Sequence, residues 1–289
     1  MSVAKKYCVI GHPVAHSLSP EVQNAAFEKL GIEAVFEKVD VQPDELGAFM
    51  HRFRSVYDGC NVTIPHKEKV IEYLDELSDD ARLIGAVNVV VTENGRLIGH
   101  NTDRYGAMTA LAEGLCGKMN GKNVIVLGAG GAARALVYGC LRAGANITIL
   151  NRTLANAKTL ADAFNQIRKD ENIENFHVIK YGSLDDWNVE QCDLLVNTTP
   201  VGMEPGIDSA PIDILHGRSE ISRTNFTVMD IIYRPLFTKL LRDAQEIGAK
   251  IITGDTMFLH QAARGFALWT GHKAPLELLR KILSKELFV

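Results

Sequence analysis

Two side chains of opposite charge directly follow apolar stretches of the chain. Lys67 comes after GCNVTI (59–64) and a proline, and Asp103 comes after RLIGHNT (96–102). An ammonium and a carboxylate beside one alcohol can hold its oxygen and transfer its proton, a contribution of about 10²–10⁴-fold to a rate. The sequence alone leaves open which of the two takes the proton.

Further polar side chains occur where strands of the same half of the chain are expected to begin or end. Ser17 and Ser19 precede a helix, where hydroxyls and helix amides suit a carboxylate. Thr63 ends one expected strand, and Asn88 stands near the start of another. Each also has a plain structural explanation, such as a helix cap or a bond to the backbone. Because ligands of open α/β sheets lie beyond strand ends, the whole set predicts a substrate site.

A glycine-rich turn in the second half has the pattern of a dinucleotide site. VIVLGAGGAARAL (124–136) matches G-x-G-x-x-A between an expected strand and an expected helix. Gly128 permits a tight turn, Gly130 lets the backbone approach a pyrophosphate, and Ala133 allows close helix–strand packing. The helix amides add donors and a partial positive charge. The expected pyrophosphate contacts are Gly128, Ala129, Gly130, Gly131 and Ala132.

The next expected strand indicates which dinucleotide binds. An NAD site presents Asp or Glu to the ribose about 20 residues after the turn. This chain has Asn151, Arg152 and Thr153 there. A guanidinium with two neutral hydrogen-bonding groups suits the additional phosphate of NADP. We therefore expect NADP as the cofactor.

Strand-like and helix-like stretches alternate in both halves, which predicts an α/β fold of two domains with mainly parallel sheets. In the first half, strands are expected at 6–11, 34–41, 59–64, 86–95 and 96–102, and helices at 19–31, 43–55 and 66–78. Asn94-Gly95 predicts a hairpin that adds an antiparallel edge. In the second half, strands are expected within 121–127, 146–153, 193–200, 226–233 and 249–254, with a helix at 235–248. We expect a substrate domain at 1–103, joined by the C-terminal helices 255–289, and an NADP-binding Rossmann domain at 104–254.

Composition narrows the class of protein. A net charge of −4 over 289 residues gives no reason to expect nucleic acid or a membrane surface as a partner. Five scattered cysteines without a C-x-x-C pair, and no apolar run long enough for a bilayer, predict a cytoplasmic protein. His12 and His16 are separated by Pro13 and form no H-E-x-x-H motif, so no metal is expected.

Seven motifs in order resemble the shikimate dehydrogenase family over nearly the whole chain: GHPVAHSLSP, NVTIPHK, IGAVN, GHNTD, GAGGAARA, NRT and LHQA. The resemblance implies reversible reduction of 3-dehydroshikimate to shikimate with NADPH, in aromatic amino-acid biosynthesis. It implies substrate contacts by Ser17, Ser19, Thr63, Asn88, Tyr233 and Gln261, with Lys67 and Asp103 at the reacting oxygen. It implies further cofactor contacts by Asp79, Thr198, Ile231, Gly254 and Met257. We expect a small-molecule substrate and a monomer or homodimer.

Two positions depart from the family pattern. The family motif is commonly N-T-D-G, whereas Arg104 follows Asp103 here and either acts on that carboxylate or points to solvent. A basic side chain is common five residues after the asparagine of NRT, but Asn156 stands there. One phosphate contact is therefore missing unless Lys158 replaces it.

Two alternatives stay open beside this interpretation. A quinate/shikimate dehydrogenase using NAD is one, and its relatives often carry threonine in place of the second serine. Ser19 and Arg152 favour shikimate and NADP. The other is a binding or regulatory protein with the same fold but no turnover. Such a protein should have lost the amine or the carboxylate, and both are present.

Overall fold

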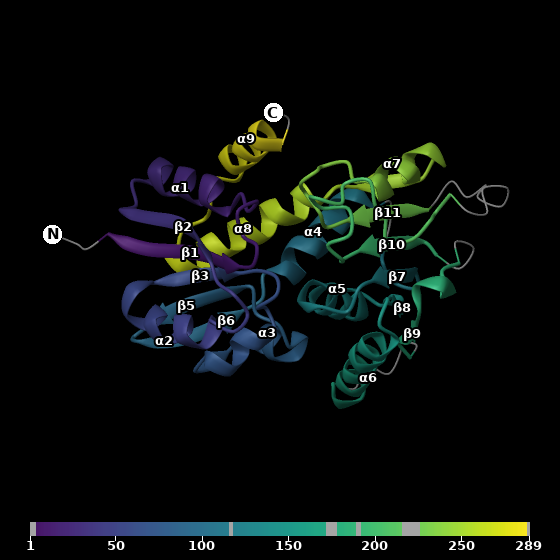
Figure 1. Cartoon of the computed structure of the whole chain (residues 1–289), viewed down its shortest axis with the longest axis horizontal. Coiled ribbons are helices and arrows are strands. Elements are labelled where there is room, and N and C mark those ends of the chain that lie inside the picture. Colours follow the sequence, from purple (N-terminus) through teal and green to yellow (C-terminus); the bar gives the residue numbers. More distant parts are fainter. Residues whose placement is uncertain (1–3, 116–117, 172–177, 189–191, 216–225, 288–289) are drawn as a thin grey trace. The chain divides into compact units, whose positions relative to one another are not determined.

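The computed structural model describes residues 4–115, 118–171, 178–188, 192–215 and 226–287. The chain forms two compact units, Met1–Gly106 with Leu259–Val289, and Ala107–Phe258 (Figure 1). The boundaries expected after residues 103 and 254 fall a few residues before these. Each unit holds one sheet of six strands, which confirms the predicted α/β class.

The sheet of the first unit is mixed, with strand order β2-β1-β3-β5-β6-β4. Its strands are β1 (Lys5–Gly11), β2 (Ala34–Asp40), β3 (Gly59–Val62), β4 (Glu76–Leu77), β5 (Val89–Glu93) and β6 (Arg96–His100). Strand β1 is parallel to both of its neighbours, whereas β5 is antiparallel to β3 and to β6. The hairpin predicted at Asn94-Gly95 is present, and both residues have the positive φ that such a turn requires (51° and 77°). It does not form the edge, because β4 pairs beyond β6.

The prediction of a helix at 66–78 is wrong. This stretch forms a short 3₁₀ helix, η1 (Lys69–Tyr73), and then the edge strand β4. Its leucines have helical spacing, yet they pack on the sheet: a Cβ on Gly99 would come within 2.6 Å of Leu74 and 2.8 Å of Leu77. The Asp75 carboxylate accepts from the Leu97 amide (2.7 Å), which joins this stretch to β6. Pairing with a distant strand therefore overrides the local pattern.

Helices cover both faces of the first sheet (Figure 1). They are α1 (Ser19–Leu30), α2 (Leu46–Val56), α3 (Asp79–Ile84), the start of α4 (Asp103–Gly114), most of α8 (Gly254–Thr270) and α9 (Leu276–Leu287). Cys8 and Ile10 of β1 pack in one core cluster with α2. Tyr7 instead stacks with Phe27 of α1 and contacts Trp269 of α8 in a tilted arrangement. Because β1 is buried on both faces, its sequence is a continuous apolar run.

The sheet of the second unit is parallel throughout, with order β12-β11-β10-β7-β8-β9. Its strands are β7 (Asn123–Leu127), β8 (Asn146–Leu150), β9 (Lys180–Gly182), β10 (Leu194–Asn197), β11 (Thr227–Asp230) and β12 (Lys250–Ile252). Its helical elements include α5 (Gly131–Arg142), α6 (Leu154–Asp170), η2 (Leu184–Asp186) and α7 (Lys239–Glu246). The strand order reverses between β7 and β10, which is where doubly wound folds bind dinucleotides.

Candidate active site

Four strand ends of the first sheet meet at one edge, and most of the predicted substrate residues stand there. Strands β1 and β3 are parallel and end together. Since β5 is antiparallel to β3 and β6 is antiparallel to β5, β5 begins and β6 ends at this same edge. The sheet topology thus gathers residues that lie far apart in sequence.

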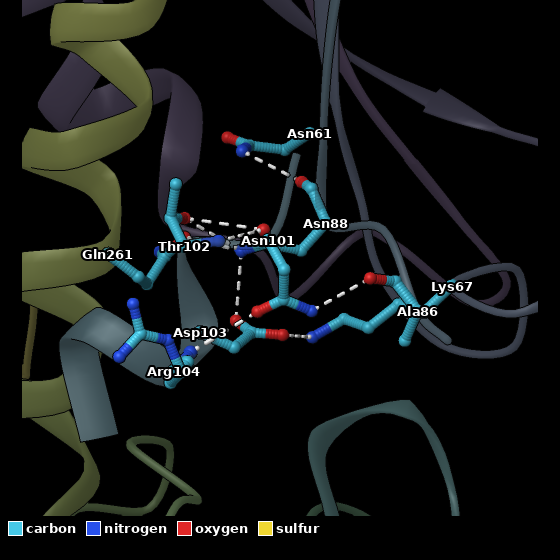
Figure 2. Close-up of polar contacts among 9 residues, drawn as sticks. All are labelled: Asn61, Lys67, Ala86, Asn88, Asn101, Thr102, Asp103, Arg104 and Gln261. Atoms are coloured by element: carbon cyan, nitrogen blue, oxygen red, sulfur yellow. Dashed lines mark hydrogen bonds and ion pairs between the residues drawn. The ribbon is translucent and has the colours of Figure 1, made fainter. Parts of the chain in front are cut away.

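The centre of the site is an ion pair between Lys67 and Asp103 (Figure 2). The Lys67 Nζ donates to Asp103 Oδ2 at 2.5 Å. The backbone of Lys67 is fixed because its carbonyl accepts from the Val87 amide (2.8 Å). The Asp103 side chain is 5% exposed and that of Lys67 is 17% exposed, so the ammonium is the more accessible partner.

Asn88 holds the other side of the carboxylate. Its Nδ2 donates to Asp103 Oδ1 (2.9 Å) and also approaches Thr102 Oγ1 (2.9 Å) and Gln261 Oε1 (3.3 Å). Its Oδ1 accepts from the Thr102 amide (2.6 Å). The side chain predicted as a substrate contact therefore also contacts Asp103 and Gln261.

Two asparagines that were not predicted as site residues support this arrangement. Asn101 donates to the Ala86 carbonyl (2.9 Å) and accepts from the Arg104 amide (3.2 Å), which fixes the start of α4 (Figure 2). Asn61 donates to the Asn88 carbonyl (3.3 Å). Both are buried polar residues at strand ends. Their position at strand ends could have indicated this role from the sequence, because a buried side-chain amide needs hydrogen-bond partners.

The hydroxyl groups predicted to bind substrate lie at the ends of β1 and β3. Ser17 Oγ donates to Ser19 Oγ (3.2 Å) and accepts from the Ser19 amide (3.3 Å). Ser19 does not cap α1, whose N-cap is Leu18 and has no side-chain bond. Thr63 reaches the same edge because Gly11 has no side chain there: a Cβ on Gly11 would come 2.4 Å from Thr63 Cγ2.

Arg104, which follows Asp103, contacts a carboxylate of another helix. Its guanidinium forms an ion pair with Asp80 of α3 (2.5 Å). In Figure 2 its side chain points to the side of Asp103 opposite Lys67. The arginine that stands in place of the glycine of the family motif N-T-D-G is therefore engaged by a carboxylate of α3. The arginine connects two helices of the first unit.

Two predicted residues belong to a different unit from most others of their set. Asp79 belongs to the first unit, although it was expected at the cofactor; it is 91% exposed and pairs with Arg82 (3.0 Å). Tyr233 belongs to the second unit, although it was expected at the substrate, and its ring lies against Phe258 with centroids 4.6 Å apart.

The glycine turn of the second unit fits a pyrophosphate. Gly128 has φ 109°, and a Cβ there would come 2.6 Å from Thr198 Oγ1. Nothing lies within 4 Å of a Cβ built on Gly130, so the space above it is open. Helix α5 begins at Gly131 with no side-chain cap and no acidic residue in its first turn. Its amides are therefore available to an anion. Ala129 and Ala132 belong to the same turn.

The end of β8 presents the residues expected at the NADP phosphate. Asn151 donates to the Thr153 carbonyl (2.9 Å), which shapes the turn. Arg152 is exposed, and no described residue pairs with it. Lys158, the suggested replacement for a basic side chain at Asn156, instead pairs with Asp162 (2.6 Å) and lies 5.9 Å from the Tyr181 ring.

The remaining predicted cofactor residues flank β11 and β10. Thr198 donates to the Leu127 carbonyl (2.6 Å), across the point where the strand order reverses. Gly254 packs on Ile231, where a Cβ would come 2.4 Å from the Ile231 carbonyl oxygen. Met257 is buried on α8.

The described part of the chain contains neither a metal-binding cluster of His, Cys, Asp and Glu nor a membrane-spanning helix. In the described part of the chain, no group of three or more His, Cys, Asp or Glu side chains could hold a metal ion. His12 instead bonds Asp40 (2.6 Å), and this hydrogen bond lowers the pKa of the Asp40 carboxyl. Among the helices of the described ranges, none is long and apolar enough to cross a membrane.

Comparison with known proteins matches both halves of the chain. Residues 9–90 match the shikimate dehydrogenase substrate binding domain, residues 110–196 match shikimate / quinate 5-dehydrogenase, and residues 256–283 match the shikimate 5′-dehydrogenase C-terminal domain. The shikimate dehydrogenase (NADP⁺) of Methanocaldococcus jannaschii is 41% identical over 276 residues, 95% of this chain and 94% of that protein. That of Pyrococcus abyssi is 42% identical over 286 residues, 98% of each chain.

A solved structure is similar over nearly the whole chain. The crystal structure of the Thermus thermophilus shikimate 5-dehydrogenase, in complex with NADP(H) and shikimate, has a TM-score of 0.82 and 35% identity. The match covers 97% of this chain and 99% of that one.

Proposed function

The chain belongs to the shikimate dehydrogenase family, and we propose that Lys67 and Asp103 carry its proton transfer. It is an NADP-dependent oxidoreductase that interconverts 3-dehydroshikimate and shikimate, a step of aromatic amino-acid biosynthesis. One observation carries the proposal: a lysine and an aspartate form a shielded 2.5 Å pair at the edge where the candidate substrate hydroxyls meet.

Lys67 is the group of the pair that contacts the reacting oxygen. An ammonium has three N–H donors, and one of them is engaged by Asp103. The other two can donate to the substrate oxygen, and in the reduction Lys67 gives that oxygen a proton. NADPH, when bound, supplies the hydride. In the oxidation, Lys67 takes the proton back.

Asp103 keeps the ammonium in place. Its two oxygens are held by different partners, Oδ2 by Lys67 and Oδ1 by Asn88. A carboxylate fixed on both sides cannot rotate away from the lysine when the charge on the lysine changes. This is preorganisation of the kind that lowers the barrier to proton transfer.

The substrate lies against hydroxyl and amide groups of the same unit. Ser17 precedes α1 and Ser19 is its first residue, where a carboxylate is favoured by hydroxyls and helix amides together. Thr63, which directly follows β3, and Gln261 of α8 complete the set. Tyr233, in the second unit, is proposed as an additional contact.

The second unit binds the dinucleotide through the turn at Gly128–Ala132, with Arg152 at the ribose phosphate. The open space above Gly130 and the uncapped α5 support the first assignment. The exposed guanidinium of Arg152 supports the second. Asn151, Thr153, Thr198, Ile231, Gly254, Met257 and Asp79 are proposed as further contacts.

A cytoplasmic location and a monomer or homodimer remain proposals. Four buried cysteines, Cys8, Cys60, Cys140 and Cys192, are free thiols. Free thiols are usual where glutathione keeps cysteines reduced, which supports the cytoplasm.

Initial rates test the function directly. We expect oxidation of shikimate with NADP to exceed oxidation of quinate, and NADP to exceed NAD with either substrate. If quinate is oxidised with NAD at a rate equal to or higher than that of shikimate with NADP, the protein is instead the quinate-type enzyme. An absence of turnover with all four pairs would favour a binding protein.

A further inference from the structure

Asp230 is a buried carboxylate in the second unit that has no part in the chemistry described above. It ends β11, and its side chain is fully buried. No described lysine, arginine or histidine forms an ion pair with it, and burial raises its pKa to about 6. Burying a carboxylate without a cation is costly, so its hydrogen bonds must offset that cost.

Those hydrogen bonds join two strand ends and a helix start. Asp230 accepts from Asn197 Nδ2 on both oxygens (3.1 Å each), from the Ile232 amide (3.0 Å) and from Thr238 Oγ1 (2.8 Å). Thr238 is the N-cap of α7, and its Oγ1 also accepts from the Leu241 amide (3.4 Å). The carboxylate therefore fixes the segment between β11 and α7.

Asn197 fixes the segment after the neighbouring strand β10. It is fully buried, and its Oδ1 accepts from both the amide (2.9 Å) and the Oγ1 (2.7 Å) of Thr199. Its Nδ2 donates to the Val201 carbonyl (3.2 Å) in addition to Asp230. One amide thus holds residues 199–201 and connects them to Asp230.

The two segments held in this way carry proposed cofactor contacts. Thr198 follows Asn197 directly and lies against Gly128 of the glycine turn. Ile231 follows Asp230 directly and lies against Gly254. In the strand order, β10 and β11 are on one side of β7, and β8 with Arg152 is on the other. A dinucleotide whose pyrophosphate lies at the turn after β7 extends its adenosine over β8 and its nicotinamide over β10 and β11.

We propose that Asp230 and Asn197 are positioning residues for the nicotinamide half of NADP. This inference rests on the proposed function, which supplies the cofactor. The pair touches neither the nicotinamide nor the substrate. It sets the backbone of the two segments against which the nicotinamide is held for hydride transfer. The alternative is that the pair only stabilises the second unit.

The two roles are separated by a probe that contains only the adenosine half, 2′,5′-ADP. In the full-length protein, Asp230→Asn places an amide N–H against the Nδ2 of Asn197 in either orientation, because Asn197 donates to both carboxylate oxygens. One orientation also loses the bond from the Ile232 amide. We expect kcat/KM for NADP in shikimate oxidation to fall about 10–100-fold, because small displacements of reacting groups have effects of this size. We expect the affinity for 2′,5′-ADP to change less than about twofold.

Two further variants complete the experiment. Thr199→Val removes one hydrogen-bond donor to Asn197, and Thr199 is only partly buried. The variant therefore keeps the proposal testable if Asp230→Asn does not fold. We expect kcat/KM for NADP to fall in this variant too, by a smaller factor. Asp243→Asn is the matched control. It alters another buried carboxylate of the same unit, which pairs with Lys239 on α7, and we expect it to lower stability without changing kcat/KM.

The proposal would be overturned if Asp230→Asn or Thr199→Val lost affinity for NADP and for 2′,5′-ADP in parallel. It would also be overturned if both variants kept the kinetics of the wild type. If the wild-type protein oxidises no shikimate, the proposed function fails separately. The affinities for NADPH and 2′,5′-ADP, measured by binding alone, then still decide the positioning role.

Discussion

At the residue scale, the site depends on polar groups that restrain one another. Asp103 has a partner on each oxygen, and one of these partners, Asn88, also contacts Thr102 and Gln261. Removing one partner of a buried carboxylate leaves the cost of its desolvation in place. A single amide therefore acts on the proposed catalytic group through its hydrogen bond.

Asn88→Ala should lower kcat for shikimate oxidation about 10–100-fold, because Asp103 loses the partner of its Oδ1. The affinity for NADP should change little, since Asn88 belongs to the first unit. Asn24→Ala is the matched control, because Asn24 bonds the Phe36 backbone in the same unit (2.9 and 2.8 Å). If Asn24→Ala lowers kcat as much as Asn88→Ala does, the effect comes from stability alone.

Arg152→Ala should raise KM for NADP much more than KM for NAD, because only NADP carries the phosphate that the guanidinium contacts. Steady-state kinetics with both cofactors measure this. Lys158→Ala should have a smaller effect, since that ammonium already pairs with Asp162. Equal increases for both cofactors in Arg152→Ala would place the arginine outside the phosphate site.

At the element scale, the segments that carry the site are fixed by contacts between elements distant in sequence. Asn88 meets Thr102 because β5 and β6 are antiparallel, with Val89 opposite His100. Arg104 at the start of α4 meets Asp80 in the first turn of α3. This ion pair is about one-third exposed, so it contributes modestly to stability.

Arg104→Gly and Asp80→Asn should each lower stability slightly, with a coupling energy of about 0.2–1 kcal/mol in a double-mutant cycle. We expect kcat to stay within about threefold of wild type, because the guanidinium points away from Lys67. Thermal denaturation and steady-state rates measure the two effects. A large loss of kcat in Arg104→Gly alone would show that the arginine acts on Asp103 after all.

The elements that sequence could predict are those that local chemistry decides. Asn94-Gly95 forms its turn because both residues adopt positive φ, and the turn at Gly128 likewise uses a positive φ (109°) that favours glycine. The stretch 66–78 could not be predicted, since its leucines pack on Gly99 of a strand later in the chain. For the same reason, the bond between the Asn88 amide and Asp103 could not be predicted, because it depends on the register of β5 and β6.

At the scale of the whole molecule, the two units carry complementary parts of the chemistry. The Lys67–Asp103 pair and most proposed substrate contacts belong to the first unit, and most proposed cofactor contacts belong to the second. The second unit also contains a buried acid, Asp230, whose raised pKa couples its folding to pH.

Asp230 should make the second unit less stable as pH rises from about 4 through about 6. Its pKa is raised from 3.8 to about 6 by burial, so the folded state binds more protons than the unfolded state in this interval. The stabilisation by Asp230 is roughly 1–3 kcal/mol in total. It is complete below the pKa that the carboxyl has in the unfolded state, and it is lost as pH rises past the pKa in the folded state. Denaturation of wild type and Asp230→Asn at several pH values measures it. If the wild type instead gained stability relative to Asp230→Asn as pH rises over this interval, the predicted pH dependence would be contradicted.

The most direct test of the account is the Lys67→Ala variant in single-turnover oxidation of shikimate, with NADP affinity measured on the same sample. Removal of the ammonium should slow the chemical step by about 10²–10⁴-fold and leave the dissociation constant for NADP nearly unchanged. A chemical step as fast as that of the wild type would contradict the role of Lys67 as the proton donor and acceptor.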